Sequence, residues 1–218
     1  MADKQKVVDW PPCQLMLVVE PGPGALQRLK AALECATISA VLIRPMAGDK
    51  LGAGEVKPLV DLIQDQGAAA LLFGDAVLTK TLGADGVHLP AGLDTAQRVA
   101  AARALLGPEA NLGVDAGHSR HTAMEAGEGG ADYVAFSAVE ATEESRRARD
   151  DLVTWWAEIF EIPCVAMDIH SADDAEQADT CGADFAALTL PRQTVEEIMV
   201  LAGDVNNRLQ AYEMEGGT

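Results

Sequence analysis

The chain contains little that would place it in a membrane, in an oxidising compartment or around a zinc ion. Its longest apolar runs, such as Ala68 to Phe73, are far shorter than the roughly 20 residues that span a bilayer. The opening residues MADKQKVVDW carry charge and no apolar stretch, so we expect no export signal and a cytoplasmic protein. The four cysteines lie far apart without a C-x-x-C pair, which favours reduced core thiols over disulfides or a zinc site.

Positive charge is scarce. The 218 residues include 16 Lys and Arg but 34 Asp and Glu, which gives a formal net charge of -18. A chain with this charge repels a phosphate backbone, so we expect no nucleic-acid partner. A polyphosphate substrate would need a metal ion or a local cationic pocket. We expect most of the acidic residues to lie on solvated helix surfaces.

Common nucleotide-binding and hydrolase motifs are missing as well. The sequence has no G-x-G-x-x-G, Walker A, H-E-x-x-H or nucleophile-elbow pattern, so the binding loops and catalytic sites built on these motifs are set aside. The most glycine-rich stretch, GDKLGAG at residues 48–54, is interpreted as a flexible loop, with phosphate binding as the weaker alternative.

Three stretches of the chain share one order of residues: LGADGVHL (82–89), GGADYVAF (129–136) and CGADFAAL (181–188). In each, a helical segment runs into a glycine, the usual residue for the left-handed position that ends a helix, and a β-rich segment follows. The repeat therefore marks helix-to-strand junctions. We expect Gly83, Gly130 and Gly182 to serve stability rather than chemistry.

Short apolar runs recur along the whole chain and alternate with stretches of helical spacing. The expected strands are 15–19, 38–43, 68–73, 86–90, 112–114, 133–139, 163–167 and 185–189. The expected helices are 25–36, 56–66, 95–106, 121–126, 151–160, 172–180 and 195–209. This alternation demands a parallel sheet and predicts a single-domain (β/α)8 TIM barrel, with an open doubly wound sheet as the alternative. Residues 1–13 are expected to form an N-terminal extension and residues 210–218 a flexible C-terminal tail.

Chemistry in such a barrel is built at the carboxyl ends of the strands. The polar residues at or just past the ends of the expected strands are Glu20, Arg44, Asp75, His88, Asp115, His118, Ser137, Glu140, Thr142, Asp168, His170, Thr189 and Arg192. The carboxylates of Asp75, Asp94 and Asp115 are candidates for a divalent cation, since Mg²⁺ needs only one or two of them besides substrate oxygens. His88 has a second interpretation, as a strand-end histidine satisfied by hydrogen bonds.

The stretches GADGVHLP, ALLGPEANLGVDAGHS and EGGADYVAFSAV resemble the thiamine phosphate synthase (thiamin monophosphate synthase) family. ISAVLIR before them and IPCVAMDI with CGADFAAL after them extend the likeness over most of residues 38–189, and TWWAEIFEIPCVAM resembles a divergent alphaproteobacterial subgroup. The resemblance implies a (β/α)8 barrel that joins 4-amino-5-hydroxymethyl-2-methylpyrimidine pyrophosphate to a thiazole phosphate. It also implies that Mg²⁺ assists the departure of pyrophosphate.

The resemblance and the strand ends together suggest roles for single residues. Arg44, Asp75 and Thr142 match the family in place and are the candidate catalytic residues. Asp75 and Asp94 are the candidate magnesium ligands. The candidate substrate-binding residues are His88, Asp115, His118, Ser137, Arg146 and Asp168.

Several family positions are replaced in this chain. The family's Gln-x-Arg-x-Lys appears as LIRPM at residues 42–46, so Met46 stands where a lysine is expected. Ser145 stands where a second lysine is expected, and Asp115 stands in place of a serine. Asp168 replaces a glycine that would approach a phosphate group, and a carboxylate there would repel it. Three arginines follow Ser145 closely and could compensate for its lost charge: Arg146, Arg147 and Arg149.

These replacements predict a family member whose activity is weak or lost. The alternative is a non-catalytic binding or regulatory barrel, or an enzyme for a different ligand, because a fold does not determine the chemistry it hosts. We expect a small-molecule ligand at the carboxyl-end mouth and no membrane partner. A homo-oligomer is one option, because the adjacent Trp155 and Trp156 cannot both face the barrel. Whether residues 145–151 close over the site as a loop stays open.

Overall fold

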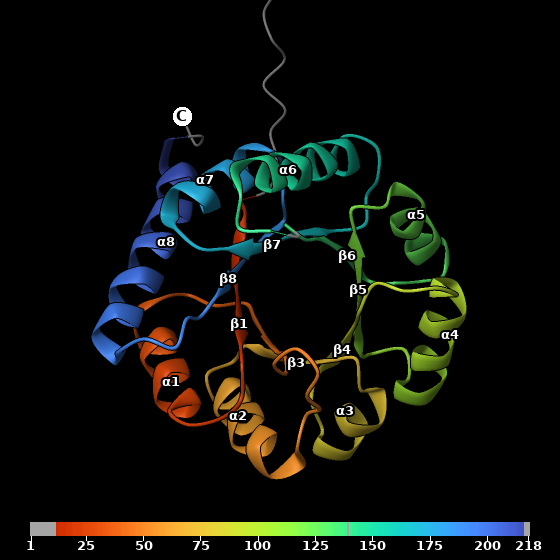
Figure 1. Ribbon diagram of the computed structural model, residues 1–218, viewed down its shortest axis with the longest axis horizontal. Helices are drawn as coiled ribbons and strands as arrows, with labels where there is room; N and C mark the ends of the chain where they lie inside the picture. Colours follow the sequence, from red (N-terminus) through yellow and green to blue (C-terminus); the bar gives the residue numbers. More distant parts are fainter. Residues whose placement is uncertain (1–11, 139, 216–218) are drawn as a thin grey trace, which may run out of the picture.

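The computed structural model describes residues 12–138 and 140–215, which form a closed barrel of parallel strands, each followed by a helix (Figure 1). The strands are β1 (Gln14–Val19), β2 (Ala40–Ile43), β3 (Ala69–Phe73), β4 (Gly86–Leu89), β5 (Asn111–Gly117), β6 (Tyr133–Phe136), β7 (Cys164–Ile169) and β8 (Phe185–Thr189). The helices are α1 (Ala25–Cys35), α2 (Ala53–Asp65), α3 (Ala76–Leu82), α4 (Thr95–Leu106), α5 (Arg120–Glu128), α6 (Glu143–Ala157), α7 (Ala172–Thr180) and α8 (Val195–Glu215). Strand β1 pairs in parallel with both β2 and β8, which closes the ring. The (β/α)8 prediction is confirmed.

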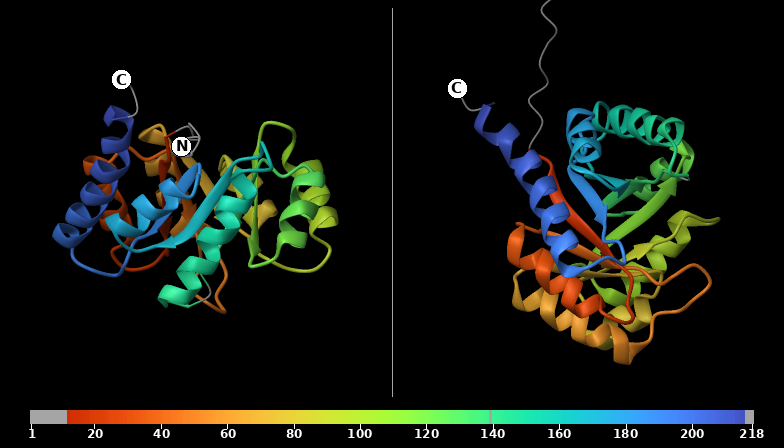
Figure 2. Two further views of the ribbon diagram at one scale, coloured as in Figure 1. Left: turned by 90° about the horizontal axis from the view of Figure 1, so that it is seen from above. Right: turned by 60° about the vertical axis from the view of Figure 1, so that its left-hand side comes forward.

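The strands form because their apolar residues are buried on both faces. On β1, Met16 and Val18 belong to an apolar cluster inside the barrel, whereas Leu15, Leu17 and Val19 belong to the cluster shared with the helices. Side chains alternate between the two faces of a strand, so a continuous apolar run suits a strand that is covered on both sides. Figure 2 shows the helices packed around the outside of the barrel.

The start of α6 differs from the prediction, which placed it at residue 151. The helix begins at Glu143, because the Thr142 hydroxyl oxygen accepts a hydrogen bond from the Ser145 N–H at 3.2 Å. The acidic residues of the first turn, Glu143 and Glu144, also stabilise the helix by interacting with the positive end of its dipole. Residues 145–151 are therefore part of a helix rather than a loop.

The structure also adds one helix to the expected set and extends another beyond its expected end. Helix α3, seven residues long, lies between β3 and β4 and was missing from the expected helices, because it is too short to show helical spacing. Helix α8 continues past residue 209 to Glu215, so residues 210–215 extend a helix. None of the helices among the described residues, α8 included, has the length and apolar character needed to cross a membrane.

The tryptophan pair of α6 packs within this chain. Trp156 is only 1% exposed, and its indole N–H donates to the carbonyl oxygen of Ile162 at 2.7 Å. Trp155 is half-buried, stands against Phe160, and has the Arg120 guanidinium 4.6 Å from its ring centroid. One tryptophan is therefore core, as expected, and the other is covered by the neighbouring helix α5.

The four cysteines are free, as expected: Cys13, Cys35, Cys164 and Cys181. Cys13 and Cys164 are buried in the core. Burial, with a smaller contribution from the Asp184 carboxylate, raises the pKa of the Cys164 thiol to about 12, so it stays protonated and unreactive.

The Gly-Ala-Asp junctions lie at the amino ends of β4, β6 and β8. Their glycines have positive φ angles of 69° at Gly83, 88° at Gly130 and 88° at Gly182. A residue with a Cβ is strained in this region, so glycine is the residue that ends these helices without cost. The prediction that the repeat marks helix-to-strand junctions is confirmed.

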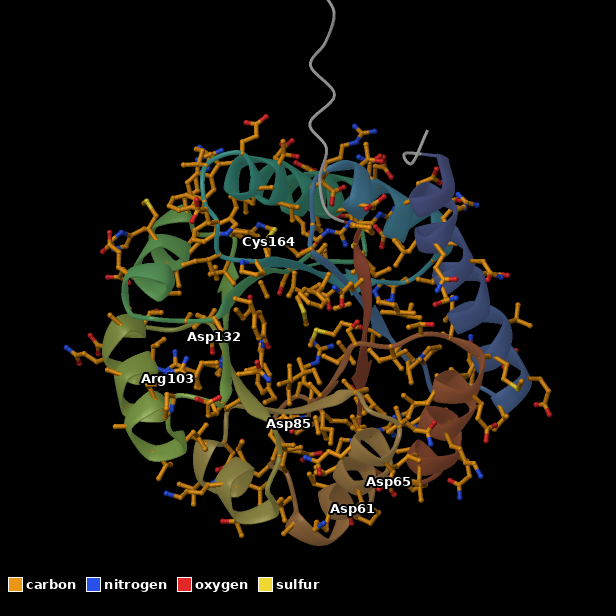
Figure 3. All side chains as sticks on the ribbon, turned by 180° about the vertical axis from the view of Figure 1, so that it is seen from behind. Asp61, Asp65, Asp85, Arg103, Asp132 and Cys164 are labelled. Carbon is orange, nitrogen blue, oxygen red and sulfur yellow. The ribbon has the colours of Figure 1, made fainter. Side chains whose placement is uncertain are left out.

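The aspartates of the repeat join the beginnings of neighbouring strands. Each carboxylate accepts a hydrogen bond from a backbone N–H of the preceding strand: Asp85 from Ala70 (2.8 Å), Asp132 from Leu112 (2.7 Å) and Asp184 from Cys164 (2.8 Å). The backbone N–H of each aspartate donates in turn to the carbonyl oxygen of its partner on the preceding strand, which is Ala70, Leu112 or Cys164. Figure 3 shows Asp85, Asp132 and Cys164 around this end of the barrel, with Arg103 beside Asp132.

Candidate functional site

Two charged side chains at the carboxyl end of the barrel pair with each other. Arg44 follows β2 and Asp168 lies near the end of β7, and these strands are separated by β8 and β1 in the ring. The Arg44 Nη1 atom lies 3.7 Å from the Asp168 Oδ1 atom, and the two side chains are 28% and 21% exposed. The pair therefore reaches across part of the mouth.

The backbone at Asp168 keeps a conformation that suits glycine. Its φ angle is 58°, and the pairing of β7 with β8 shifts register between Ala166 and Ile169. An aspartate thus stands at a glycine-like bend, where the resemblance implies a glycine. Because Arg44 lies beside it, the negative charge of this replacement is compensated within the mouth.

A second ion pair joins the ends of β8 and β1. Arg192 Nε lies 3.3 Å from the Glu20 Oε2 atom, and its Nη2 atom lies 2.8 Å from the Met46 Sδ atom. The three residues follow β8, β1 and β2, which are successive strands of the barrel. Sequence reasoning found Arg192 only as a strand-end residue, because 172 positions separate it from Glu20. Closure of the barrel brings them together.

His88 lies in the barrel interior on β4. Its side chain is fully buried, and its Nδ1 atom lies 3.0 Å from the Tyr133 hydroxyl oxygen. Burial lowers the pKa of His88 to about 4, while the Asp115 carboxylate raises it and the Arg44 guanidinium lowers it by smaller amounts. The ring is therefore neutral at neutral pH. Its Nε2 atom has no hydrogen-bond partner within the described segments, so the interpretation as a satisfied histidine holds for one ring nitrogen only.

Tyr133, the partner of His88, was missed by sequence reasoning. It begins β6 and reaches His88 on β4 by crossing the intervening strand β5 at Gly113. A Cβ atom at Gly113 would lie 1.9 Å from the Tyr133 ring, so only glycine leaves room for this contact. An isolated glycine inside a strand signals such a close approach, and Gly113 was the available sign. Burial raises the pKa of the Tyr133 hydroxyl, which stays protonated.

Asp115, Ser137 and His118 form one hydrogen-bonded group at the ends of β5 and β6. Asp115 Oδ1 accepts from the Ser137 hydroxyl at 3.1 Å and from the Gly117 N–H at 2.8 Å. The His118 Nε2 atom lies 2.6 Å from the Ser137 carbonyl oxygen, to which it donates. Although Asp115 stands in place of the family serine, a serine hydroxyl lies against its carboxylate.

The two candidate magnesium ligands, Asp75 and Asp94, are exposed and begin α3 and α4. One Asp75 oxygen caps α3 by accepting from the Leu78 N–H at 2.8 Å. Asp94 has a φ of 56° and makes no capping hydrogen bond. The strand ends that precede them are tied together, because the Gly74 N–H donates to the His88 carbonyl oxygen at 2.8 Å.

These carboxylates suit Mg²⁺, which binds hard oxygen donors and keeps several waters. Over residues 12–138 and 140–215, no group of three or more His, Cys, Asp or Glu is arranged to hold a metal ion. A magnesium ion at this mouth would therefore depend on one or two carboxylates together with substrate oxygens, the mode typical of this ion.

Thr142 and Arg146 stand at the start of α6. Thr142 is exposed and caps the helix, as described above. Arg146 lines a cavity of about 100 Å³ together with Asp168 and His170 at the ends of β6 and β7. Its guanidinium also lies 3.2 Å from the Glu143 carboxylate. Arg146 is thus the arginine of α6 that lies beside the mouth.

Arg149 points elsewhere. It is fully buried, and its guanidinium donates to the Asp150 and Asp174 carboxylates and to the Met167 carbonyl oxygen at 2.7–2.9 Å. These partners belong to α6, α7 and β7. The hypothesis that Arg149 compensates for a missing phosphate-binding lysine is therefore wrong, since each of its three guanidinium nitrogens donates to a partner within α6, α7 or β7.

The fold and this arrangement of groups define a class of protein: a (β/α)8 barrel whose charged and polar residues gather at the carboxyl ends of its strands. This is the end at which barrels of this type bind small molecules. Cations and carboxylates from β1, β2, β7 and β8 lie on one side of the mouth, and the β3 to β6 ends carry the remaining candidates.

Comparison with known proteins narrows this class. The model of the family described as "Thiamine monophosphate synthase" matches residues 15–190. The thiamine-phosphate synthase of Erythrobacter litoralis (strain HTCC2594) is 39% identical over 188 residues, covering 82% of this chain and 87% of that protein. The one from Rhodospirillum centenum (strain ATCC 51521 / SW) is 38% identical over 183 residues, covering 81% and 87%. The chain belongs to the thiamine phosphate synthase family of thiamine biosynthesis.

Solved structures agree on the fold. A thiamine phosphate pyrophosphorylase from Pyrococcus furiosus superposes with a TM-score of 0.73 at 20% identity, covering 91% of this chain and 96% of that one. A tryptophan synthase structure from M. tuberculosis reaches the same TM-score of 0.73 at 14% identity. Because unrelated activities share this likeness, it supports the barrel and not the reaction.

Proposed function

We propose that this chain catalyses thiamine phosphate synthesis, joining the hydroxymethylpyrimidine pyrophosphate to the thiazole phosphate with release of pyrophosphate, and that it does so slowly. Membership of the family supports the reaction. The observation that carries the proposal is the 3.7 Å contact between Arg44 and Asp168. The Asp168 carboxylate alone would repel a phosphate group, but Arg44 compensates its charge. The mouth can therefore still accept an anionic substrate.

The exposed carboxylates of Asp75 and Asp94 are the proposed magnesium ligands. When bound there, Mg²⁺ would neutralise charge on the departing pyrophosphate. Arg44 is the proposed cationic contact to the same group, and Thr142 the proposed hydroxyl contact beside it. The proposed substrate-binding residues are His88, Asp115, His118, Ser137, Arg146 and Asp168.

The proposed slowness has a local cause. Ser145 carries no charge where the family resemblance implies a lysine. Removing one group that stabilises developing charge costs on the order of 10² to 10³ in rate. No observation favours the alternative of a regulatory or purely binding barrel.

A direct product assay tests the proposal. Purified protein is given both family substrates and Mg²⁺, and thiamine phosphate is separated by chromatography and quantified. We expect product that requires both substrates, stops with a chelator, and forms with a turnover number below about 0.1 s⁻¹, well under the common value of about 10 s⁻¹. No product above an enzyme-free control would contradict the reaction, and a turnover near the common value would contradict the slowness.

A further inference from the structure

The side chain of Arg192 lies where three strand ends meet. Its Nε atom lies 3.3 Å from the Glu20 carboxylate, and its Nη2 atom lies 2.8 Å from the Met46 sulfur. The Arg192 side chain is 49% exposed and that of Glu20 is 31% exposed. A cation from the end of β8 therefore contacts a neutral residue that follows β2.

The neutral residue stands at a position where the family resemblance implies a lysine. The Sδ atom of methionine corresponds to the Cδ atom of lysine, and a lysine ammonium would lie two bonds further out, about 2.5 Å away at ordinary bond lengths. The Arg192 Nη2 atom lies 2.8 Å from that sulfur. A guanidinium nitrogen of Arg192 and the ammonium of a lysine at position 46 would therefore both lie within about 3 Å of this position, and at most about 5.3 Å from each other.

The two mouth arginines on this side differ in exposure. Arg44 lies 3.7 Å from Asp168 and is 28% exposed, whereas Arg192 is more exposed and its ion pair is open to solvent. An exposed ion pair contributes at most about 1 kcal/mol, so an incoming anion with more charge than one carboxylate can displace Glu20. A guanidinium also offers two parallel N–H donors to phosphate oxygens.

We propose that Arg192 binds the pyrophosphate group of the substrate in this chain, in place of the lysine that Met46 replaces. The inference rests on the proposed function for the identity of the substrate. The anion site itself, formed by Arg192 beside Met46, can be tested without turnover by measuring its affinity for inorganic pyrophosphate.

The test measures binding of inorganic pyrophosphate, with Mg²⁺ present, by isothermal titration calorimetry. We expect Arg192→Ala to weaken binding by about 10- to 100-fold, the effect of losing charge-assisted hydrogen bonds. Lys30→Ala is the matched control, since it removes one positive charge from an exposed position on α1 and should change the affinity less than twofold. The melting temperature of Arg192→Ala should stay within about 2 °C of the wild type, because exposed pairs contribute little stability.

A rescue variant separates charge placement from any other effect. Met46→Lys combined with Arg192→Ala returns a cation to the same place from β2, and we expect it to recover most of the lost affinity. Unchanged binding in Arg192→Ala, a loss in Lys30→Ala as large as that in Arg192→Ala, absence of rescue, or no pyrophosphate binding by the wild type would each overturn the inference.

The two proposals fail separately. If the wild type makes no thiamine phosphate but binds pyrophosphate in an Arg192-dependent way, the reaction is wrong and the anion site stands. If the wild type turns over while Arg192→Ala keeps both its pyrophosphate affinity and its KM for the pyrimidine pyrophosphate, the reaction stands and the inference about Arg192 is overturned.

Discussion

At the amino end of the barrel, three junctions repeat one hydrogen-bond pattern, whereas at the carboxyl end each strand is followed by different residues. The aspartates of the amino end accept from a backbone N–H of the preceding strand at 2.7–2.8 Å. At the carboxyl end, Arg44 and Arg192 make longer contacts of 3.7 and 3.3 Å to carboxylates, and the buried Nε2 atom of His88 has no partner in the described part of the chain.

The difference separates groups that hold the fold from groups that can bind a ligand. The carboxylates of the amino end join neighbouring strands of the barrel, and they lie at the end opposite the proposed site. A half-exposed arginine in a loose pair, or a ring nitrogen without a partner, can exchange its contact for one to a ligand at small cost. Repetition in this sequence therefore marks scaffold, and the residues that do not repeat mark the site.

The largest expected effect is the loss of stability on replacing Arg149. This residue belongs to α6, which begins at the mouth, so the substitution tests whether part of that helix serves stability rather than binding. Arg149→Leu leaves Asp150 and Asp174 without their buried partner. We expect it to lower the free energy of unfolding by about 3–5 kcal/mol, because uncompensated buried charge is costly. Urea unfolding measures the change.

Its matched control lies two positions away. Arg147 is 75% exposed and forms an ion pair with Glu143, so Arg147→Leu should change the free energy of unfolding by less than about 0.5 kcal/mol. Equal effects of the two substitutions would show that Arg149 is not part of the scaffold.

The next effect concerns the pH dependence that His88 confers. Its pKa falls from 6.5 to about 4 on burial, so between these values the unfolded chain binds a proton that the folded chain does not. Stability must therefore fall as the pH is lowered through this window, by on the order of 3 kcal/mol in total. The His88→Gln variant lacks this contribution. The difference in free energy of unfolding between the wild type and the variant should therefore shrink as the pH falls from 7 to 4.

NMR titration of the histidine ring checks the cause of that pH dependence. We expect the His88 signals to titrate near pH 4. A midpoint near 6.5 for His88 would contradict a desolvated ring inside the barrel and would assign the pH dependence of stability to other groups.

The smallest effect concerns the glycines of the amino end. At Gly83 and Gly130 a Cβ atom would meet nothing within 4 Å, so Ala there costs only the strain of a positive φ, roughly 1 kcal/mol. Gly203, inside α8, also has open space but lacks a positive φ, so Gly203→Ala should instead stabilise by about 0.5–1 kcal/mol. Thermal unfolding should show a lower melting temperature for the two junction variants and a higher one for Gly203→Ala. Shifts in the same direction would rule out backbone strain as the explanation. The two junction variants should also keep full ligand binding.

The barrel could be predicted from the sequence because its signals are local. Each strand is a short apolar run, and each Gly-Ala-Asp marks a junction that neighbouring residues alone define. The start of α6 was missed because its first two turns are polar, and apolar spacing begins only at Leu152. Its capping residue, Thr142, was interpreted through the family resemblance rather than as a helix start.

The candidate site could be predicted as a set of strand ends but not as a set of contacts. Arg44 and Asp168 were each named, yet their pairing depends on how far β2 and β7 lie apart around a closed ring. The same closure brings Arg192 to Met46. Tyr133 reaches His88 because Gly113, on the strand between them, has no side chain. Distances across a barrel are set by tertiary structure, which residue spacing does not encode.

One matched pair of variants tests the central claim, that the carboxyl end carries the activity and the amino end the stability. Asp75→Asn keeps a good helix cap but loses the charge proposed to hold Mg²⁺, and Asp85→Asn weakens a hydrogen bond at the opposite end. In the thiamine phosphate assay, Asp75→Asn should lose at least about 100-fold in turnover with an unchanged melting temperature. Asp85→Asn should lose about 1–3 kcal/mol of stability and keep its turnover per folded molecule within twofold. Full turnover in Asp75→Asn, or lost turnover in folded Asp85→Asn, would contradict the account.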